Sequence, residues 1–187
     1  MPRLFTALEI PADIGERLSM LRGGLPGARW IDPENYHLTL RFIGDIDDAL
    51  ANDVVQVLAG VRRAAFDLVL DGLDAFGGRK PRAVFAAAPA VPPLVELQAE
   101  HERLMQRIGI PAEGRKFSPH VTLARLRQTS SRQVADYLAA RADFRSAAFP
   151  VERFVLMSSR ASTGGGPYVV EAAYPLRAEA LAGPAEG

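Results

Sequence analysis

Short segments of alternating apolar and polar residues recur along the chain, which is the pattern of strands that bury one face. They are bounded by glycine and proline turns, and they predict strands over residues 4–10, 36–43, 66–70, 83–87, 120–126, 151–159 and 168–176. A short extended piece is also predicted around Trp30. Gly164-Gly165-Gly166-Pro167 is predicted to be a flexible connection between the last two strands.

Four other segments place apolar residues three and four positions apart, the spacing of a helix with one buried face. They cover residues 11–22, 48–61, 92–108 and 131–142. Strands and helices follow one another without the regular alternation that a parallel sheet needs, so the sequence predicts an α+β fold. On the third helix His101 shares an apolar stripe with Leu97 and Leu104. We therefore expect His101 to be a half-buried structural histidine with one satisfied ring nitrogen.

The chain has 187 residues, enough for one domain of ordinary size or for one domain made of two similar lobes. We expect residues 1–176 to form this domain and residues 177–187 to be a frayed, disordered tail. The N-terminus lacks the long apolar region of a signal peptide, and no stretch approaches 18 uninterrupted apolar residues. The sequence therefore predicts a soluble cytoplasmic protein that does not enter a membrane.

The 22 basic and 22 acidic residues cancel, so the chain has no overall positive field with which to hold nucleic acid non-specifically. An anionic ligand has to be bound locally. The tripeptide Gly-Arg-Lys occurs twice, at residues 78–80 and 114–116, and we interpret each copy as a solvated turn. The absence of cysteine excludes disulfides, iron–sulfur clusters and thiol nucleophiles. Most of the candidate chemistry therefore rests on three histidines, His37, His101 and His120.

Two of these histidines lie in the same four-residue pattern, His37-Leu38-Thr39-Leu40 and His120-Val121-Thr122-Leu123. The copies are 83 residues apart, in a chain with only five threonines, so the pattern is a specific internal repeat. Side chains two positions apart on a strand share a face, and the histidine and threonine of each copy therefore point the same way. If a pseudo-twofold axis relates the two halves, both pairs converge on a groove between two sheets.

Strict alternation along these strands also assigns faces to the neighbouring residues. It places Phe42 in the core and Arg41 on the same face as His37. Arg41 is therefore a candidate for a phosphate contact, and equally for an ion pair with an acid at the rim. The same rule points Arg125 away from His120 unless the strand twists or bulges.

Two imidazoles and two hydroxyls around one ligand suit an in-line displacement at phosphorus. Histidine titrates near pH 6.5, so a neutral ring is able to deprotonate water while a protonated ring donates to the departing oxygen. The hydroxyls of Thr39 and Thr122 are suited to hold the non-bridging oxygens. Two alternatives are a pair of buried structural histidines and a metal site. A metal site would be short of ligands, because neither motif has a carboxylate at ligand spacing, so we expect no metal and no other cofactor.

At these residues the chain resembles the 2H phosphoesterases, and among them the bacterial RNA 2′,3′-cyclic phosphodiesterases first described as 2′-5′ RNA ligases. Residues 3–7 resemble the family's opening strand, residues 30–44 and 117–125 its two motif blocks, and residues 167–176 its closing strand. The resemblance implies a bilobal fold of two antiparallel sheets that face a central groove, with helices outside. It also implies metal-independent hydrolysis of a terminal 2′,3′-cyclic phosphate to a 2′-phosphomonoester, and 2′-5′ RNA ligation as the reverse reaction.

The same resemblance assigns roles to individual residues. His37 corresponds to the acid that protonates the departing 3′ oxygen, and His120 to the base that activates water. Thr39 and Thr122 correspond to the phosphate-binding threonines, and Arg125 at the end of the second motif is an additional phosphate ligand.

The expected partner is an RNA 3′ end with a 2′,3′-cyclic phosphate, bound by a monomer. A base is expected to stack on an aromatic ring, for which Tyr168 and Phe85 are the candidates. Phe42 is a third candidate, although strict alternation places it in the core. One alternative substrate is a small cyclic-phosphate nucleotide or a 2′-5′ oligoadenylate. An alternative of another class is an RNA-end binding module without catalysis.

Overall fold

The computed structural model describes residues 3–159 and 166–178. In chain order its elements are β1 (Arg3–Glu9), α1 (Ala12–Ser19), β2 (Ala28–Trp30), the 3₁₀ turn η1 (Pro33–Asn35), β3 (His37–Asp45), α2 (Asp48–Leu58), β4 (Phe66–Leu68), β5 (Leu73–Phe76), β6 (Ala83–Ala87), α3 (Pro92–Arg107), β7 (His120–Leu126), α4 (Ser131–Ala139), β8 (Phe149–Val151), β9 (Arg153–Ser159) and β10 (Tyr168–Pro175). The predicted helices and strands are confirmed, with two differences. Strand β5 occupies a segment expected to be loop, and the strand expected over 151–159 is divided into β8 and β9. The predicted glycine-rich connection falls largely outside the described residues.

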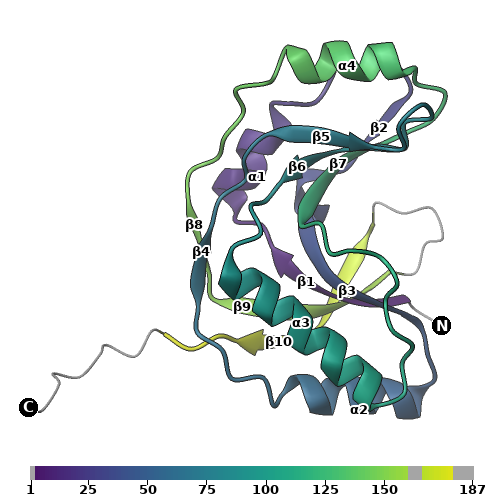
Figure 1. Cartoon of the computed structure of the whole chain (residues 1–187). Helices are drawn as coiled ribbons and strands as arrows, with labels where there is room; N and C mark the ends of the chain where they lie inside the picture. Colours follow the sequence, from purple (N-terminus) through teal and green to yellow (C-terminus); the bar gives the residue numbers. More distant parts are fainter. Residues whose placement is uncertain (1–2, 160–165, 179–187) are drawn as a thin grey trace, which may run out of the picture.

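One antiparallel sheet runs through the described part of the chain, with strand order β10-β9-β1-β3-β7-β6-β5 and β2 beside β7. We call β10-β9-β1-β3 the first lobe and β2-β7-β6-β5 the second lobe. The lobes meet where β3 pairs with β7 at Leu38 and Val121. Figure 1 shows the ribbon as a crescent, with α2 and α3 along the first lobe and α4 along the second. The expected bilobal α+β fold is confirmed, with the difference that the two expected sheets are joined into one where β3 pairs with β7.

A pseudo-twofold axis relates the two lobes, and equivalent residues are 83 positions apart in the sequence, as in the repeated motif. Two antiparallel pairs join residues that are 83 positions apart, Leu38 with Val121 and Asp67 with Pro150. The helix caps also follow this offset, since Asp47 caps α2 and Ser130 caps α4, each through its side chain. The internal repeat is therefore a property of the whole fold and not only of two short motifs.

The third histidine lies in the core of the first lobe. His101 on α3 is fully buried, its Nδ1 is 2.9 Å from the hydroxyl of Thr6, and its ring packs on Phe154 at 4.6 Å. Its Nε2 is buried and has no hydrogen-bond partner among the described residues. The prediction of a structural histidine with one satisfied nitrogen is confirmed, although the side chain is more deeply buried than expected.

The domain extends slightly beyond its predicted end. Arg177 was expected to begin the tail, but its N–H donates to the carbonyl of Arg63 (2.9 Å) and its carbonyl accepts from the N–H of Ala65 (2.6 Å). The fold therefore includes the backbone of Arg177, one residue beyond the expected end, because the segment before β4 holds it. The expected disorder from residue 179 onward lies outside the described residues. Among the helices that the structure describes, none is long and apolar enough to cross a membrane.

Candidate active site

Strands β3 and β7 carry the two motifs side by side at the centre of the sheet. They pair at the second residue of each motif, Leu38 and Val121, and both of these side chains are fully buried. The flanking residues point to the opposite side, which we call the histidine face. It carries His37, Thr39, His120 and Thr122, the side chains that were predicted to converge. In the antiparallel register, His37 is the neighbour of Thr122 across the strands, and Thr39 is the neighbour of His120.

Both histidines are oriented by a carbonyl two residues earlier in the chain. Nδ1 of His37 is 2.9 Å from the carbonyl oxygen of Asn35, and Nδ1 of His120 is 2.6 Å from that of Ser118. A carbonyl oxygen only accepts hydrogen bonds, so Nδ1 carries the proton in the neutral ring and Nε2 carries the lone pair. Each Nε2 is thereby available to take a proton from a ligand or, once protonated, to donate one.

Aromatic rings support both imidazoles in closely similar ways. The ring of His37 is 5.1 Å from Phe5 and 4.8 Å from Tyr168, with Tyr168 edge-on at 79°. The ring of His120 is 5.0 Å from Phe85 and 4.9 Å from Phe76, with Phe76 edge-on at 79°. Tyr168 and Phe85, predicted to stack on a nucleobase, therefore lie at the site but pack against the histidines. The sequence reasoning missed Phe5 and Phe76, because their strands carry no motif.

Burial lowers the pKa of both histidines below the usual value. For His37 the burial effect is the largest, the hydrogen bond to Asn35 opposes it, and the nearby charges of His120 and Arg125 lower the pKa further. For His120 burial again dominates, the hydrogen bond to Ser118 opposes it, and Arg125 lowers the pKa. Both rings are therefore neutral at neutral pH without a ligand. A bound anion would favour protonation of one of them.

A β-bulge changes the faces of the residues that follow each motif. The register of β3 against β1 shifts at Leu40, and that of β7 against β6 shifts at Leu123, so two consecutive residues of each strand are buried. Arg125 then returns to the histidine face, where it is close enough to influence the pKa of both histidines. Strict alternation predicted that Arg125 would face the site only if the strand twisted or bulged, and the bulge at Leu123 meets this condition.

The equivalent bulge in β3 overturns two predictions. Phe42 was expected in the core, but it is 58% exposed and its ring lies 5.7 Å from Phe5, which contacts His37. Phe42 is related to Arg125 by the offset of 83 residues, so one lobe presents an aromatic ring where the other presents a guanidinium. Arg41 was expected on the histidine face, but the bulge turns it toward the helices.

Arg41 is consequently a structural residue and not a phosphate ligand. Its side chain is only 5% exposed, and its guanidinium pairs with Glu102 on α3 and donates to the carbonyls of Phe42 and Pro111. Burial alone would raise the pKa of Glu102, but hydrogen bonds from Arg41, the Glu113 backbone and Gln106 lower it. This network ties β3 and α3 to the segment that leads into His120. The alternative interpretation of Arg41, an arginine paired with an acid, is the correct one.

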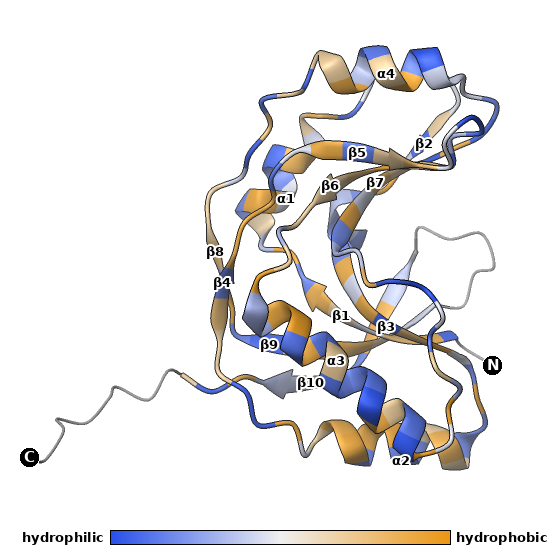
Figure 2. Ribbon diagram, in the orientation of Figure 1, coloured by the Kyte–Doolittle hydropathy of each residue, from blue (hydrophilic) through white to orange (hydrophobic). Residues whose placement is uncertain are grey.

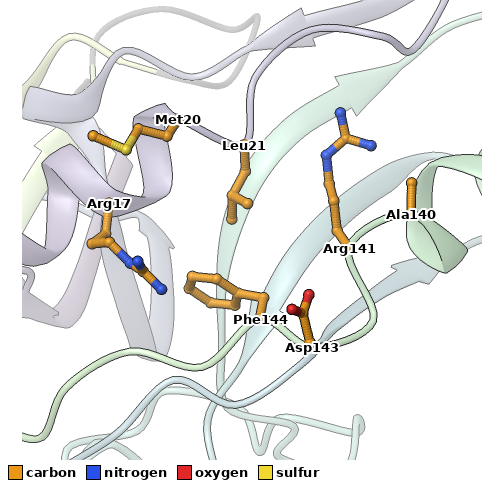
Figure 3. Close-up of a pocket in the computed structure, with 7 residues that line it drawn as sticks. All are labelled: Arg17, Met20, Leu21, Ala140, Arg141, Asp143 and Phe144. Atoms are coloured by element: carbon orange, nitrogen blue, oxygen red, sulfur yellow. The ribbon is translucent and has the colours of Figure 1, made fainter.

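A cavity of about 200 Å³ lies elsewhere, between α1 and the segment after α4 (Figure 3). Its lining residues are Arg17, Met20, Leu21, Ala140, Arg141, Asp143 and Phe144. None of these belongs to the repeated motifs or to the histidine face. Within residues 3–159 and 166–178, no three His, Cys, Asp or Glu side chains are grouped in a way that could hold a metal ion.

Comparison with protein families gives two matches, one for each half of the sequence. A model of the family described as LigT-like phosphoesterase matches residues 8–86 and again residues 84–168. The first match contains His37 and the second contains His120. The duplication observed in the fold therefore coincides with two copies of one family pattern.

Curated relatives from several bacteria and archaea carry the name RNA 2′,3′-cyclic phosphodiesterase. The protein of Aquifex aeolicus is 30% identical over 147 residues, which cover 76% of this chain and 78% of the relative. That of Aeropyrum pernix is 35% identical over 113 residues, which cover 59% of this chain and 64% of the relative. That of Geobacillus stearothermophilus is 30% identical over 128 residues, which cover 65% of this chain and 41% of the relative. The chain thus spans less than two thirds of the latter two proteins.

Solved structures show the same fold over almost the whole chain. The crystal structure of Escherichia coli LigT complexed with 3′-AMP has a TM-score of 0.77 and 26% sequence identity, and the match covers 94% of this chain and 99% of that protein. A protein of Thermus thermophilus has a TM-score of 0.78 and 26% identity, with 95% of this chain and all of that chain covered.

Proposed function

Because the chain belongs to the LigT-like phosphoesterase family, we propose that it hydrolyses the 2′,3′-cyclic phosphate at an RNA 3′ end to a 2′-phosphomonoester. The observation that carries the proposal is the pair of Nδ1-anchored histidines on one face of the sheet, related by the pseudo-twofold axis. The shared name of the curated relatives supports this substrate.

The two histidines divide acid and base catalysis between them. His120 is the less enclosed of the two, and its Nε2 takes the proton of the attacking water. His37 carries a proton when the anionic substrate is bound and donates it from Nε2 to the departing 3′ oxygen. The bond between phosphorus and this oxygen breaks, so the phosphate remains on the 2′ oxygen. When a 5′-hydroxyl replaces the attacking water, the same step forms a 2′-5′ linkage: His120 takes the proton of the hydroxyl, and His37 again protonates the departing 3′ oxygen.

Charge on the phosphate is stabilised by groups that are already in place. The hydroxyls of Thr39 and Thr122 lie beside the histidines of the opposite strand, and each donates to a non-bridging oxygen. Arg125 supplies a positive charge close to both histidines. All five groups come from one chain, so the site is complete without a second copy, and we propose that the protein acts as a monomer.

The exposed ring of Phe42 provides a stacking surface for the terminal base. Aromatic side chains commonly stack on unpaired RNA bases, and among the aromatic residues described at the site this ring is largely uncovered by neighbouring side chains. A nucleotide at the site is supported by the crystal structure of the E. coli relative complexed with 3′-AMP. The lack of cysteine fits a reducing compartment, and we place the activity in the cytoplasm.

The test is incubation of the protein with an RNA oligonucleotide that ends in a 2′,3′-cyclic phosphate, in the presence of excess chelator. The product should be an RNA with a terminal 2′-phosphate, formed at the same rate with and without chelator. A product with a 3′-phosphate would reject the assignment of the leaving oxygen. Saturable binding without any product would instead identify a binding module.

A further inference from the structure

A row of four residues crosses the second lobe next to the histidines. The strand register pairs Phe76 with Ala83, Ala83 with Arg125, and Arg125 with Arg29. Residues that are directly opposite each other on neighbouring strands point to the same side of the sheet. Phe76 contacts the ring of His120 at 4.9 Å, so the row belongs to the histidine face.

A separate contact confirms the direction of Arg29. The next residue, Trp30, packs on Tyr137 of α4 with ring centroids 5.8 Å apart, and therefore points toward the helix layer. Because side chains alternate along a strand, Arg29 points away from α4 and toward the histidine face. Arg29 is exposed, one strand beyond Arg125.

Arg29 and Arg125 form an unusual cross-strand pair, because like charges directly opposite each other destabilise a sheet. Over residues 3–159 and 166–178, neither guanidinium has a carboxylate partner within 4.0 Å. The turn between Phe76 and Ala83 adds Arg79 and Lys80 at the same end of the lobe, where Figure 2 shows a strongly hydrophilic connection. Several acids lie instead on α2 and α3 along the first lobe, so a chain with no net charge has a locally basic end.

We propose that Arg29, continued by the Arg79-Lys80 turn, binds the phosphodiester groups on the 5′ side of the terminal nucleotide. The proposal rests on the proposed function, and it makes the second lobe the part of the enzyme that distinguishes an RNA end from a cyclic mononucleotide. The terminal base lies toward Phe42 on the first lobe and the preceding backbone toward Arg29 on the second. The ligand is a nucleic acid and not an acidic peptide, because Arg29 lies directly beside Arg125 on the face that carries the histidines.

The experiment compares kcat/KM for a 2′,3′-cyclic mononucleotide with that for a short oligonucleotide ending in the same cyclic nucleotide. The variants are Arg29→Gln and the control Arg103→Gln, which removes an equal charge from the exposed surface of α3 on the other lobe. The wild type should prefer the oligonucleotide. Arg29→Gln should lower kcat/KM for the oligonucleotide about tenfold, which is the size of one charge-assisted contact. The kcat/KM for the mononucleotide should stay within about twofold of the wild-type value. Arg103→Gln should leave kcat/KM unchanged for both substrates. Arg29→Lys should restore part of the preference for the oligonucleotide.

A second readout is the dependence on salt. The slope of log kcat/KM against log salt for the oligonucleotide should become shallower by about 0.7 in Arg29→Gln, the amount for one lost contact to single-stranded nucleic acid. Equal losses on both substrates, or no preference in the wild type, would overturn the proposal and leave the basic row for another partner. Failure of the wild type to hydrolyse either substrate would instead refute the proposed function.

Discussion

The buried histidine of α3 gives a quantitative test of the fold, because it cannot accept a proton without losing stability. Protonated imidazole needs two hydrogen-bond acceptors, but His101 has only the hydroxyl of Thr6 beside Nδ1, and no partner for Nε2 among the described residues. Burial, with a smaller contribution from the charge of Arg63, lowers the pKa of His101 to about 3.

The sign and size of the effect follow from this pKa. Below pH 6.5 the unfolded chain binds a proton at His101 that the native protein does not bind until pH falls to about 3. The contribution of His101 to stability is therefore complete above pH 6.5 and is lost as the pH falls between these values, at about 1.4 kcal/mol per pH unit. Between pH 7 and pH 5 the loss amounts to about 2 kcal/mol, a sizeable part of the roughly 5–15 kcal/mol that stabilises a typical domain.

The assay is urea unfolding of the wild type and His101→Gln at pH 7 and pH 5. Carboxylates and the other histidines titrate in both proteins, so the difference between the proteins isolates His101. The stability of the wild type relative to His101→Gln should fall by about 2 kcal/mol between the two pH values. Thr6→Val, which keeps the imidazole, should be less stable at both pH values and retain the wild-type pH dependence. A difference between the wild type and His101→Gln that does not change with pH would refute the reasoning.

Three further predictions concern the site and its surroundings. Burial lowers the pKa of both site histidines, so kcat/KM should fall with rising pH from a point below the usual histidine pKa. The fall in kcat should begin at a higher pH, because bound phosphate favours the protonated form of the acid. Steady-state rates from about pH 4.5 to 9 check this, and an alkaline limb of kcat at or below that of kcat/KM would contradict it. Phe42→Ala should raise KM about tenfold with little change in kcat or thermal midpoint, since stacking of a base contributes about 1–3 kcal/mol, and Phe42→Tyr should restore KM. An unchanged KM would exclude this ring as the stacking surface. Arg41→Ala should lower the free energy of unfolding by about 3 kcal/mol, because it leaves Glu102 without its buried partner, and should leave KM unchanged. A tenfold rise in KM with little loss of stability would return Arg41 to the phosphate site.

Local signals in the sequence were sufficient for most of the fold. The spacing of apolar residues and the alternation through the motifs predicted where helices and strands lie, and these positions are confirmed. The caps at Asp47 and Ser130 lie directly before two of the predicted helices. Strand β5 was missed because it is short, only partly buried and preceded by Gly72. Its existence depends on pairing with β6, which is a tertiary contact that no local pattern reveals.

The site was predictable up to the bulges and not beyond them. The face of His37, Thr39, His120 and Thr122 follows from period two, but the extra residue at Leu40 or Leu123 reverses the assignments of the residues directly after it. This one irregularity explains why Arg41 and Phe42 were assigned to the wrong faces. The role of Arg29 could not be seen either, because its proximity to Arg125 arises from the pairing of β2 with β7, strands that are far apart in the sequence.

The central claim is that His37 and His120 form one acid and base pair, and the most direct test is the pH dependence of kcat/KM for each single glutamine variant on cyclic-phosphate RNA. The wild type should give a bell-shaped profile. His120→Gln should lose the rise on the acidic side and His37→Gln the fall on the alkaline side, each with a rate about 10²–10⁴-fold lower at the optimum. A variant that keeps both limbs of the profile at the wild-type rate would contradict the account.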